Sequence, residues 1–227
     1  MNFSIQARDD VAVDVLVAGG GPSGCAAAIA ARRRGLSVLL VEATSALGGT
    51  ATGGQVAHWL GGRSPGGRWV VGGIFRELAE GAVADGCAIL PSMPADTTYQ
   101  PYAWLPWFIH GVPLDPYRLV PFLERKLAAE GVRFRYETRV VGVESTNGRI
   151  ARVVTHDKEG FAARPVRCVS TQRAMPMWPR LLDVPSMWGA TATTSRRRRR
   201  SRSTFRTSIM RSCCRPLRKH ARRSSAS

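Results

Sequence analysis

The feature that most constrains this chain is a glycine-rich turn between two apolar segments near its start. Residues 12–18 read AVDVLVA, a Val-rich run typical of a strand buried on both faces. The turn GGGPSG follows, CAAAIAARRRG then favours a helix ending at Gly35, and SVLLVE is a second buried strand ending in an acid. This order is that of the βαβ unit of a dinucleotide site. The sequence therefore predicts an α/β fold with a parallel sheet.

Each residue of the turn has a physical role in such a site. Gly19 allows a tight turn out of the strand, Gly21 lets backbone N–H groups approach a pyrophosphate, and Gly24 lets helix and strand pack closely. Pro22 and Ser23 lie between Gly21 and Gly24 in the same turn. We therefore predict that these five residues bind the diphosphate of a dinucleotide.

The acid at the end of the second strand, Glu42, is placed to accept hydrogen bonds from a ribose diol. It argues against a 2′-phosphate, because two anions would repel each other there. The segment VEATSALGGTAT resembles the acid-then-Leu-Gly-Gly segment of FAD-dependent oxidoreductases with the glutathione-reductase-like Rossmann fold. It is especially similar to the group related to the heterodisulfide reductase flavin subunit.

That resemblance implies that Gly48, Gly49 and Thr50 line the pyrophosphate and flavin of FAD. It favours FAD over NAD as the cofactor and implies an oxidoreductase that transfers hydride or electrons through the flavin. Two alternatives stay open at this point, a second turn without a ligand and an NAD-dependent Rossmann enzyme. Neither the substrate nor the electron acceptor can be derived from the residues.

Residues 53–113 are rich in Gly, Pro and Trp, and 73–86 is their one helix-like stretch. In the resembled family this region is an excursion that helps to build the flavin and substrate pocket. The candidates to stand near the isoalloxazine ring are His58, Trp59, Trp104, Trp107 and His110. Alternatively, the tryptophans are core residues and the histidines polar surface residues. No catalytic residue is named, because flavin carries the hydride chemistry itself.

The next part of the sequence predicts a helix followed by antiparallel strands. Residues 114–130 place Leu119, Phe122, Leu123 and Leu127 on one face of a helix. The strands that follow contain Asn-Gly at 147–148 between alternating apolar residues, the strongest short hairpin signal. We therefore expect a β-hairpin or meander after the helix.

The same resemblance implies that the backbone of the first strand of this hairpin contacts the adenine ring. The positions concerned are Val140 and Val141. A β-strand with no role in ligand binding is the alternative for both residues.

Composition places the chain outside several other classes. The five cysteines are odd in number and lack zinc, redox or iron–sulfur spacing, so we predict no metal site and a reducing, cytoplasmic location. No apolar run reaches the roughly 18 residues that a membrane helix requires, and MNFSIQARDD lacks the pattern of a signal peptide. We expect a small-molecule substrate and no membrane partner, and leave the oligomeric state open.

The charge is distributed very unevenly along the chain. Residues 1–168 carry a net charge of +3, whereas residues 169–227 carry +14 and include the run SRRRRRSRS. This tail is open to three interpretations: a basic arm for nucleic acid or anionic lipid, a disordered terminus, or translation from the wrong reading frame. If the tail is a disordered terminus or is read in the wrong frame, any nucleic-acid binding through it is non-specific.

The genetic code favours the wrong frame, because Met and Trp have one codon each. With codon boundaries shifted to the third base, Met175-Pro176 forces Ala and Met177-Trp178 forces Val. From residue 169 onward the shifted frame permits Leu-Asp-Ala-Thr-Gly-Asp-Ala-Asp-Val-Ala. The resembled family expects an apolar strand ending in Asp-Ala-Thr-Gly-Asp at this place. An Arg-rich, Lys-poor tail is also typical of a GC-rich gene read out of frame.

These observations predict a partial FAD-binding domain over 1–168 and an Arg/Ser-rich, non-native or disordered tail over 169–227. We expect the Rossmann-like sheet to be incomplete, with one central strand missing and an edge exposed. The predicted function is an FAD-dependent oxidoreductase that is truncated and inactive as written. A basic nucleic-acid-binding protein that uses the tail is the alternative from another class.

Overall fold

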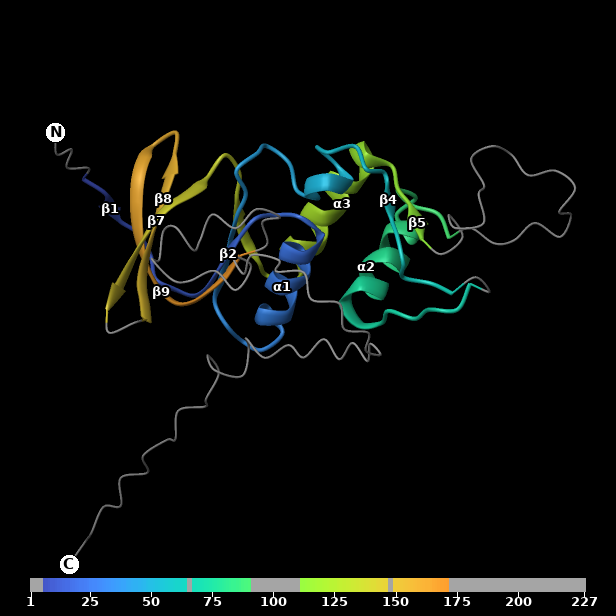
Figure 1. Cartoon of the computed structure of the whole chain (residues 1–227), viewed down its shortest axis with the longest axis horizontal. Helices are drawn as coiled ribbons and strands as arrows, with labels where there is room; N and C mark the ends of the chain where they lie inside the picture. The colour runs from blue at the N-terminus through green and yellow to red at the C-terminus, as the bar shows by residue number, and fades with distance from the viewer. Residues whose placement is uncertain (1–5, 65–66, 91–110, 147–148, 172–227) are drawn as a thin grey trace, which may run out of the picture. The chain divides into compact units, whose positions relative to one another are not determined.

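A mixed sheet of seven strands forms the centre of the molecule (Figure 1). Its strands are β1 (Arg8–Asp9), β2 (Val13–Ala18), β3 (Val38–Val41), β6 (Arg133–Arg135), β7 (Arg139–Thr146), β8 (Arg149–Asp157) and β9 (Gly160–Thr171). The order is β6-β3-β2-β9-β8-β7, with β1 beside β9. The pairs β6–β3, β3–β2 and β2–β9 are parallel, whereas the pairs β9–β8 and β8–β7 are antiparallel. The computed structural model describes residues 6–64, 67–90, 111–146 and 149–171.

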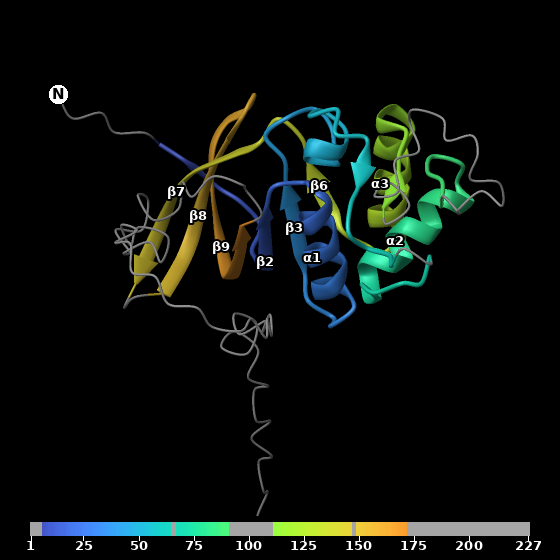
Figure 2. The same ribbon diagram turned by 45° about the vertical axis from the view of Figure 1, so that its right-hand side comes forward.

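The predicted βαβ unit is confirmed as β2, the helix α1 (Pro22–Arg32) and β3. The register pairs Val15 with Val38 and Ala18 with Val41, so the two strands are parallel neighbours. The helix begins three residues earlier than the apolar pattern indicates, because Pro22 suits the first helical position, where its missing N–H costs nothing. Figure 2 shows α1 lying alongside β2 and β3. The fold class predicted from the sequence is therefore correct.

Two apolar clusters hold the sheet from its two faces. On one face, Val15, Val17 and Leu40 pack with Ile29 of α1 and with apolar residues of the other helices. On the other face, Leu16 and Leu39 pack with residues of the hairpin β7–β8 such as Val153. This alternation along β2 and β3 follows from the period of two in a strand. The parallel strands are consequently buried on both faces, as their Val-rich sequences indicate.

The predicted helix over 114–130 is α3 (Pro116–Ala129), and its four predicted core residues are all buried. Asp115 caps its N-terminus by accepting hydrogen bonds from two backbone N–H groups. The predicted hairpin is β7–β8, whose register closes on the pair Thr146 and Arg149. Residues 147–148 themselves lie outside the described residues.

One prediction about the sheet is wrong. The central strand expected to be missing is present, because residues 166–171 of β9 pair in parallel with β2, from Val13–Val166 to Ala18–Thr171. The first half of β9 is the third strand of the meander, pairing with β8, and the same strand continues into the parallel sheet. A strand of 12 residues serves both partners, so the chain up to Thr171 already supplies the central position.

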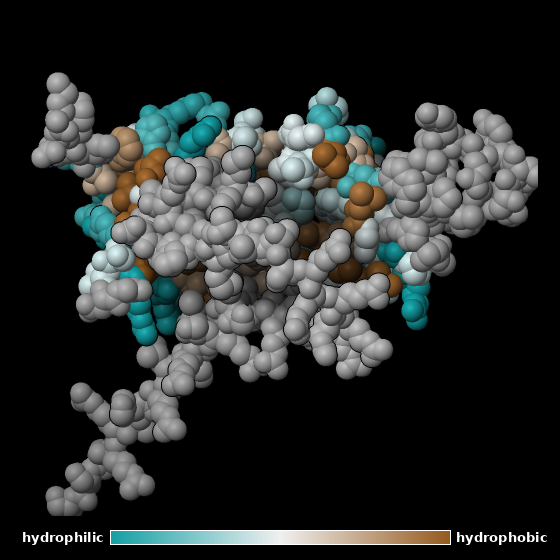
Figure 3. All heavy atoms as spheres, viewed as in Figure 1, coloured by the Kyte–Doolittle hydropathy of each residue, from teal (hydrophilic) through white to brown (hydrophobic). Residues whose placement is uncertain are grey.

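The described part of the predicted excursion contains a small two-stranded sheet and one helix. These are β4 (His58–Trp59), β5 (Val112–Pro113) and α2 (Gly73–Ala84). Several large apolar side chains of this region are exposed, namely Val56, Leu60, Val70, Val71 and Ile89. Figure 3 shows hydrophobic atoms at the surface in the part of the molecule that holds these elements. Among the described residues, no helix has the length and apolarity needed to cross a membrane.

Candidate nucleotide-binding site

The glycine turn lies between β2 and α1, at the carboxyl end of the parallel strands. Gly19 has φ +112° and donates its N–H to the carbonyl of Val41 over 2.8 Å, which ties the turn to β3. Gly21 is the residue before the helix, and no side chain caps α1 there. The first helical bond runs from Cys25 N to Gly21 O. The N–H groups that precede it, together with the helix dipole, form the kind of end that attracts an anion.

The glycines at 20 and 21 are surrounded very differently. A Cβ atom on Gly20 would lie 2.6 Å from Leu47 Cδ2 and 3.2 Å from Glu42 Cβ, so this position is closed by the protein itself. A Cβ atom on Gly21 would meet no atom within 4 Å. The backbone of Gly21 therefore borders open space in front of the helix N-terminus. Folding alone does not require a glycine there.

The side chain of Glu42 turns toward the glycine turn from the end of β3. Its Oε2 accepts the N–H of Gly20 over 2.6 Å. Its Oε1 accepts both the N–H of Thr44 over 2.9 Å and the hydroxyl of Thr44 over 3.0 Å. The structure thus brings the predicted ribose acceptor and the predicted diphosphate turn into direct contact.

The second predicted glycine segment packs against the first. The N–H of Gly48 donates to Gly20 O over 2.8 Å, and a Cβ atom on Gly49 would lie 3.1 Å from Gly21 Cα. Gly48 and Gly49 have φ values of +98° and +54°, which glycine adopts without steric cost. The short 3₁₀ helix η1 (Gly49–Ala51) follows, and its middle residue Thr50 is exposed. The turn at residues 19–24, Glu42 and the glycines at 48–49 are therefore in direct contact.

The connection between β6 and β7 lies on the other side of Glu42. Thr138 N donates to Glu42 O over 2.9 Å, and Glu137 N donates to Thr44 O over 3.1 Å. Glu137 holds a left-handed backbone with φ +50°, which is uncommon outside glycine. Val140 follows in β7 and packs, partly buried, against the cluster beneath the meander. Its predicted proximity to an adenine ring stays a prediction.

The candidates of the excursion are only partly described. Trp59 is buried and packs against Phe75 with ring centroids 5.9 Å apart, and its indole N–H finds no acceptor in the described part of the chain. His58 pairs with Pro113 across the two-stranded sheet. The other three candidates, Trp104, Trp107 and His110, lie outside the described residues.

Three residues of the site were not found by sequence reasoning. Cys25 donates its thiol to Gly20 O over 3.4 Å, and burial, followed by the charge of Glu42, raises its pKa to about 12. It is therefore a packing residue rather than a nucleophile at neutral pH. Thr44 and Glu137 were also missed. A hydroxyl two residues after a carboxylate is a local signal that could have indicated Thr44, whereas nothing local indicates Glu137.

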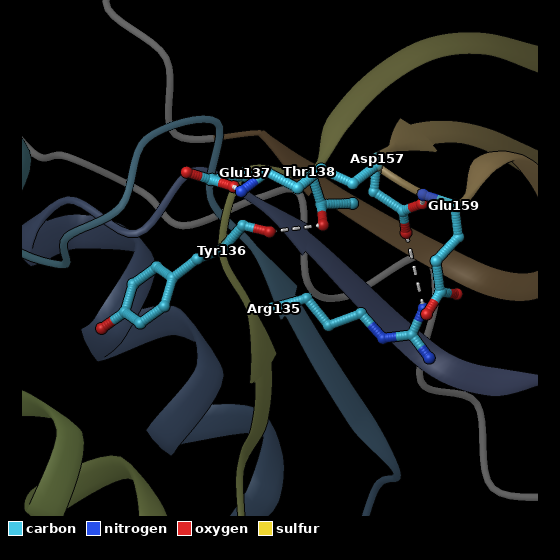
Figure 4. Close-up of a pocket in the computed structure, with 7 residues that line it drawn as sticks. Arg135, Tyr136, Glu137, Thr138, Asp157 and Glu159 are labelled. Carbon is cyan, nitrogen blue, oxygen red and sulfur yellow. Dashed lines mark hydrogen bonds and ion pairs between the residues drawn. The ribbon is translucent and has the colours of Figure 1, made fainter.

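A pocket of about 380 Å³ lies between the β6–β7 connection and the turn from β8 to β9 (Figure 4). It is lined by Arg135, Tyr136, Glu137, Thr138, Asp157, Lys158 and Glu159. Figure 4 shows Arg135 directed toward Asp157 and Glu159, while the ring of Tyr136 points away from them. Carboxylates outnumber cations in its wall, so it does not suit a diphosphate. The glycine turn remains the site for that group.

Most of the chain is similar to a known protein family. A family model described as FAD dependent oxidoreductase matches residues 14–169. None of the curated protein sequences matches the chain.

Solved structures with a similar fold include a geranylgeranyl bacteriochlorophyll reductase-like protein from Thermoplasma acidophilum (18% identity, 72% of this chain and 39% of that chain, TM-score 0.47). They also include 3-ketosteroid-delta4-(5alpha)-dehydrogenase from Rhodococcus jostii RHA1 (21% identity, 74% and 48%, TM-score 0.47). A third is the myxobacterial FAD-dependent halogenase CndH (21% identity, 71% and 37%, TM-score 0.46). The chain spans less than half the length of each of these proteins.

Proposed function

The chain belongs to the FAD-dependent oxidoreductase family, with FAD as its cofactor, and from this premise we propose that it transfers hydride or electrons through FAD held at the glycine turn. The isoalloxazine ring supplies the redox chemistry when FAD is bound. The residues of this chain have three tasks: to bind the diphosphate, to hold the adenosine ribose, and to orient the flavin.

The open space at Gly21 is the observation that carries this proposal. A methyl group there would touch no protein atom, yet the position is a glycine in front of an uncapped helix N-terminus. Gly72 shares both features, but Gly21 also lies at the carboxyl end of the parallel strands, against Gly49 and next to Gly20, whose N–H binds Glu42. There a ligand would approach the backbone closely, and a Cβ atom would stand between its phosphates and the N–H groups. Gly20 and Gly49, by contrast, are closed by neighbouring protein atoms.

The remaining predicted residues complete the proposed site. Glu42 holds the ribose, because its carboxylate lies beside the turn and is already oriented by three donors. Gly48, Gly49 and Thr50 continue the surface toward the flavin. Val140 lies at the adenine end, two residues after the backbone contact between Thr138 and Glu42.

A matched pair of glycine variants tests the proposal in the 227-residue chain. Gly21 and Gly72 both precede a helix in extended backbone, and a Cβ atom on either meets nothing within 4 Å. We expect Gly21→Ala and Gly72→Ala to leave urea unfolding unchanged, or to stabilise the chain by up to about 1 kcal/mol. Only Gly21→Ala should weaken FAD binding, by about tenfold or more, because it blocks the backbone N–H groups.

Binding is measured by titrating FAD and following its absorption bands at about 370 and 450 nm and its fluorescence. Equal FAD affinity of wild type and Gly21→Ala would place FAD elsewhere. A loss of affinity that is equal in Gly72→Ala would mean that both changes act through the fold.

We also propose that residues 169–227 are read in a shifted frame, so that the chain as written is an inactive part of a longer flavoprotein related to the heterodisulfide reductase flavin subunit. The single-codon residues of this segment support it, and so does the end of the family match at residue 169. The segment Leu-Asp-Ala-Thr-Gly-Asp that the shifted frame permits from residue 169 onward would begin within the last three residues of β9.

The nucleotide sequence around codon 169 tests the shifted frame. It should translate, without a stop, into Leu-Asp-Ala-Thr-Gly-Asp and further family sequence. A stop codon within the first few shifted codons would overturn the idea. Restoring the frame should also give flavin-dependent reduction of a dye acceptor that the written chain lacks.

A further inference from the structure

The carboxylate of Glu42 is held by three donors from two directions. Oε2 receives the N–H of Gly20, while Oε1 receives the N–H and the hydroxyl of Thr44. A glutamate side chain has three rotatable bonds, so an unrestrained carboxylate would sample many positions and lose entropy on binding a ligand. The two donors from Thr44 remove most of that freedom before any ligand arrives.

Thr44 is itself held in place by the opposite wall of the site. Its carbonyl accepts the N–H of Glu137, while Glu42 O accepts the N–H of Thr138. Glu137 reaches this position only in a left-handed backbone conformation, φ +50°. Such strain persists where surrounding contacts determine it, and here the donated N–H is one of them. The segment 42–44 is therefore fastened from the β6–β7 connection.

The Thr44 hydroxyl has a second acceptor within reach, Ala46 O at 3.2 Å. A hydroxyl carries one hydrogen and donates to one acceptor at a time. The carboxylate is charged and closer, at 3.0 Å, so it is the stronger partner. The exposed Thr44 side chain otherwise buries little, and its contribution lies in this bond.

We propose that Thr44 is a positioning residue for FAD: its hydroxyl and N–H preset the Glu42 carboxylate beside the glycine turn, where it accepts the ribose hydroxyls. The inference rests on the proposed function, since it assumes that FAD binds at this turn. Thr44 touches the carboxylate through its N–H and its hydroxyl. It acts through Glu42 alone.

Substitutions at Thr44 test this role with little risk to the fold, because the side chain is exposed and its loss leaves no cavity. Thr44→Val keeps the shape and the N–H but removes the hydroxyl, and should raise the Kd for FAD about fivefold. Thr44→Ser should restore binding to within about twofold of wild type. Thr146→Val, at an exposed threonine in the meander, is the matched control and should leave the Kd unchanged.

A double-mutant cycle separates positioning from a general structural effect. In a Glu42→Ala background, Thr44→Val should have no further effect on FAD affinity, because the group it positions is absent. An undiminished fivefold effect in that background would overturn the inference. So would a Thr44→Val variant that binds FAD as tightly as wild type.

Amide hydrogen exchange at Gly20, measured by NMR without FAD, distinguishes failure of this inference from failure of the proposed function. Thr44→Val should speed exchange of the Gly20 N–H severalfold, because Glu42 is then free to leave it. Unchanged exchange overturns the positioning role even if FAD binds the wild type. If Thr44→Val speeds exchange at Gly20 but the wild-type chain binds no FAD, the contact is supported and the proposed function is overturned instead.

Discussion

The glycine-turn region (residues 13–52) and the meander region (β1 with β7, β8 and β9) are held together by different forces. In the glycine-turn region, backbone hydrogen bonds and close approaches join three segments, and a Cβ atom at Gly20 or Gly48 would overlap buried side chains. In the meander region, arginines pair with carboxylates that lie on or beside neighbouring strands. These pairs are Arg8–Glu159, Arg152–Asp9 and Arg164–Asp10, and Arg135 of β6 also pairs with Asp10.

This difference teaches where the chain tolerates change. Close-packed backbone admits no added atom, because interiors are as dense as organic crystals. Exposed ion pairs contribute little individually and weaken with salt. The glycine-turn region should therefore respond to single methyl groups at its closed positions, Gly20 and Gly48, and not at Gly21, and the meander region to loss of charge only where the charge is buried.

The largest expected effect comes from one methyl group in the glycine-turn region. Gly48 and Gly160 have nearly the same φ, +98° and +101°, but a Cβ atom at Gly48 would overlap Thr52 Cγ2, whereas one at Gly160 would meet nothing within 4 Å. We expect Gly48→Ala to lower the free energy of unfolding by roughly 2–4 kcal/mol and Gly160→Ala by about 1 kcal/mol. Urea denaturation measures both.

The buried Thr52 side chain is what makes the two positions unequal, since its hydroxyl is bonded to Leu47 O over 2.6 Å and cannot swing away freely. If Gly48→Ala and Gly160→Ala cost the same, backbone strain alone accounts for both. The contrast in packing between the two regions would then be broken.

A smaller effect is expected from the buried cation of the meander region. The Arg164 side chain is only 4% exposed, and it donates to Val11 O over 2.9 Å and to Asp10. Burial lowers its pKa below the usual range for arginine. We expect Arg164→Met to lower the free energy of unfolding by about 2 kcal/mol. This loss is smaller than that expected on breaking an isolated buried ion pair, because Asp10 keeps its ion pair with Arg135.

The exposed Arg8 serves as the matched control for Arg164. Its nearer partner Glu159 is 74% exposed and the Arg8 side chain itself 38%, and its second partner Asp157 lies farther away, at 3.6 Å, so Arg8→Met should cost no more than about 0.5 kcal/mol. Raising NaCl to about 1 M should abolish the small effect at Arg8 and leave most of that at Arg164. Equal costs at both positions would mean that burial does not set the strength of these pairs.

Sequence patterns indicated the parts of the fold that depend on local chemistry. The βαβ unit was found because turn residues, helix formers and a terminal acid follow one another, and the core face of α3 because its apolar residues recur at helical spacing. The double role of β9 was missed. Nothing in the residues of a strand tells where it leaves one partner and joins another.

The candidate site shows the same division. Gly19 to Gly24, Glu42 and the segment 48–50 were placed correctly beside one another, because each follows the previous one along a known unit. Glu137 was missed, because its contact with Thr44 joins segments far apart in the sequence. It also requires a left-handed backbone conformation that a glutamate in the sequence does not indicate. Their roles toward FAD stay predictions until binding is measured.

The smallest expected effect comes from ion pairs on the helical side of the glycine-turn region, although close packing is expected to hold this region together. Arg33, just after α1, pairs with Glu77 of α2 and Glu130 after α3, and Lys126 of α3 also contacts Glu77. Hydrogen bonds from Arg33 and then Lys126 lower the pKa of Glu77 to about 2. The side chain of Glu77 is 37% exposed, so solvent screening weakens the pairs.

The direction of the pH dependence follows from the lowered pKa. The folded state holds Glu77 ionised below the ordinary range of a glutamate, so its stabilisation is complete above about pH 4.5 and disappears as the pH falls toward 2. We expect Glu77→Gln to lower the free energy of unfolding by only about 0.5 kcal/mol at pH 7, after allowance for screening, and to converge with wild type near pH 2. Urea unfolding at pH 7, 4.5, 3 and about 2 measures the difference.

Glu80→Gln is the control, because Glu80 pairs with Arg76 and this ion pair lies within the single helix α2. A cost at Glu77 as large as that of Gly48→Ala would mean that charge holds the glycine-turn region as firmly as close packing does, and the contrast between the two regions would fail.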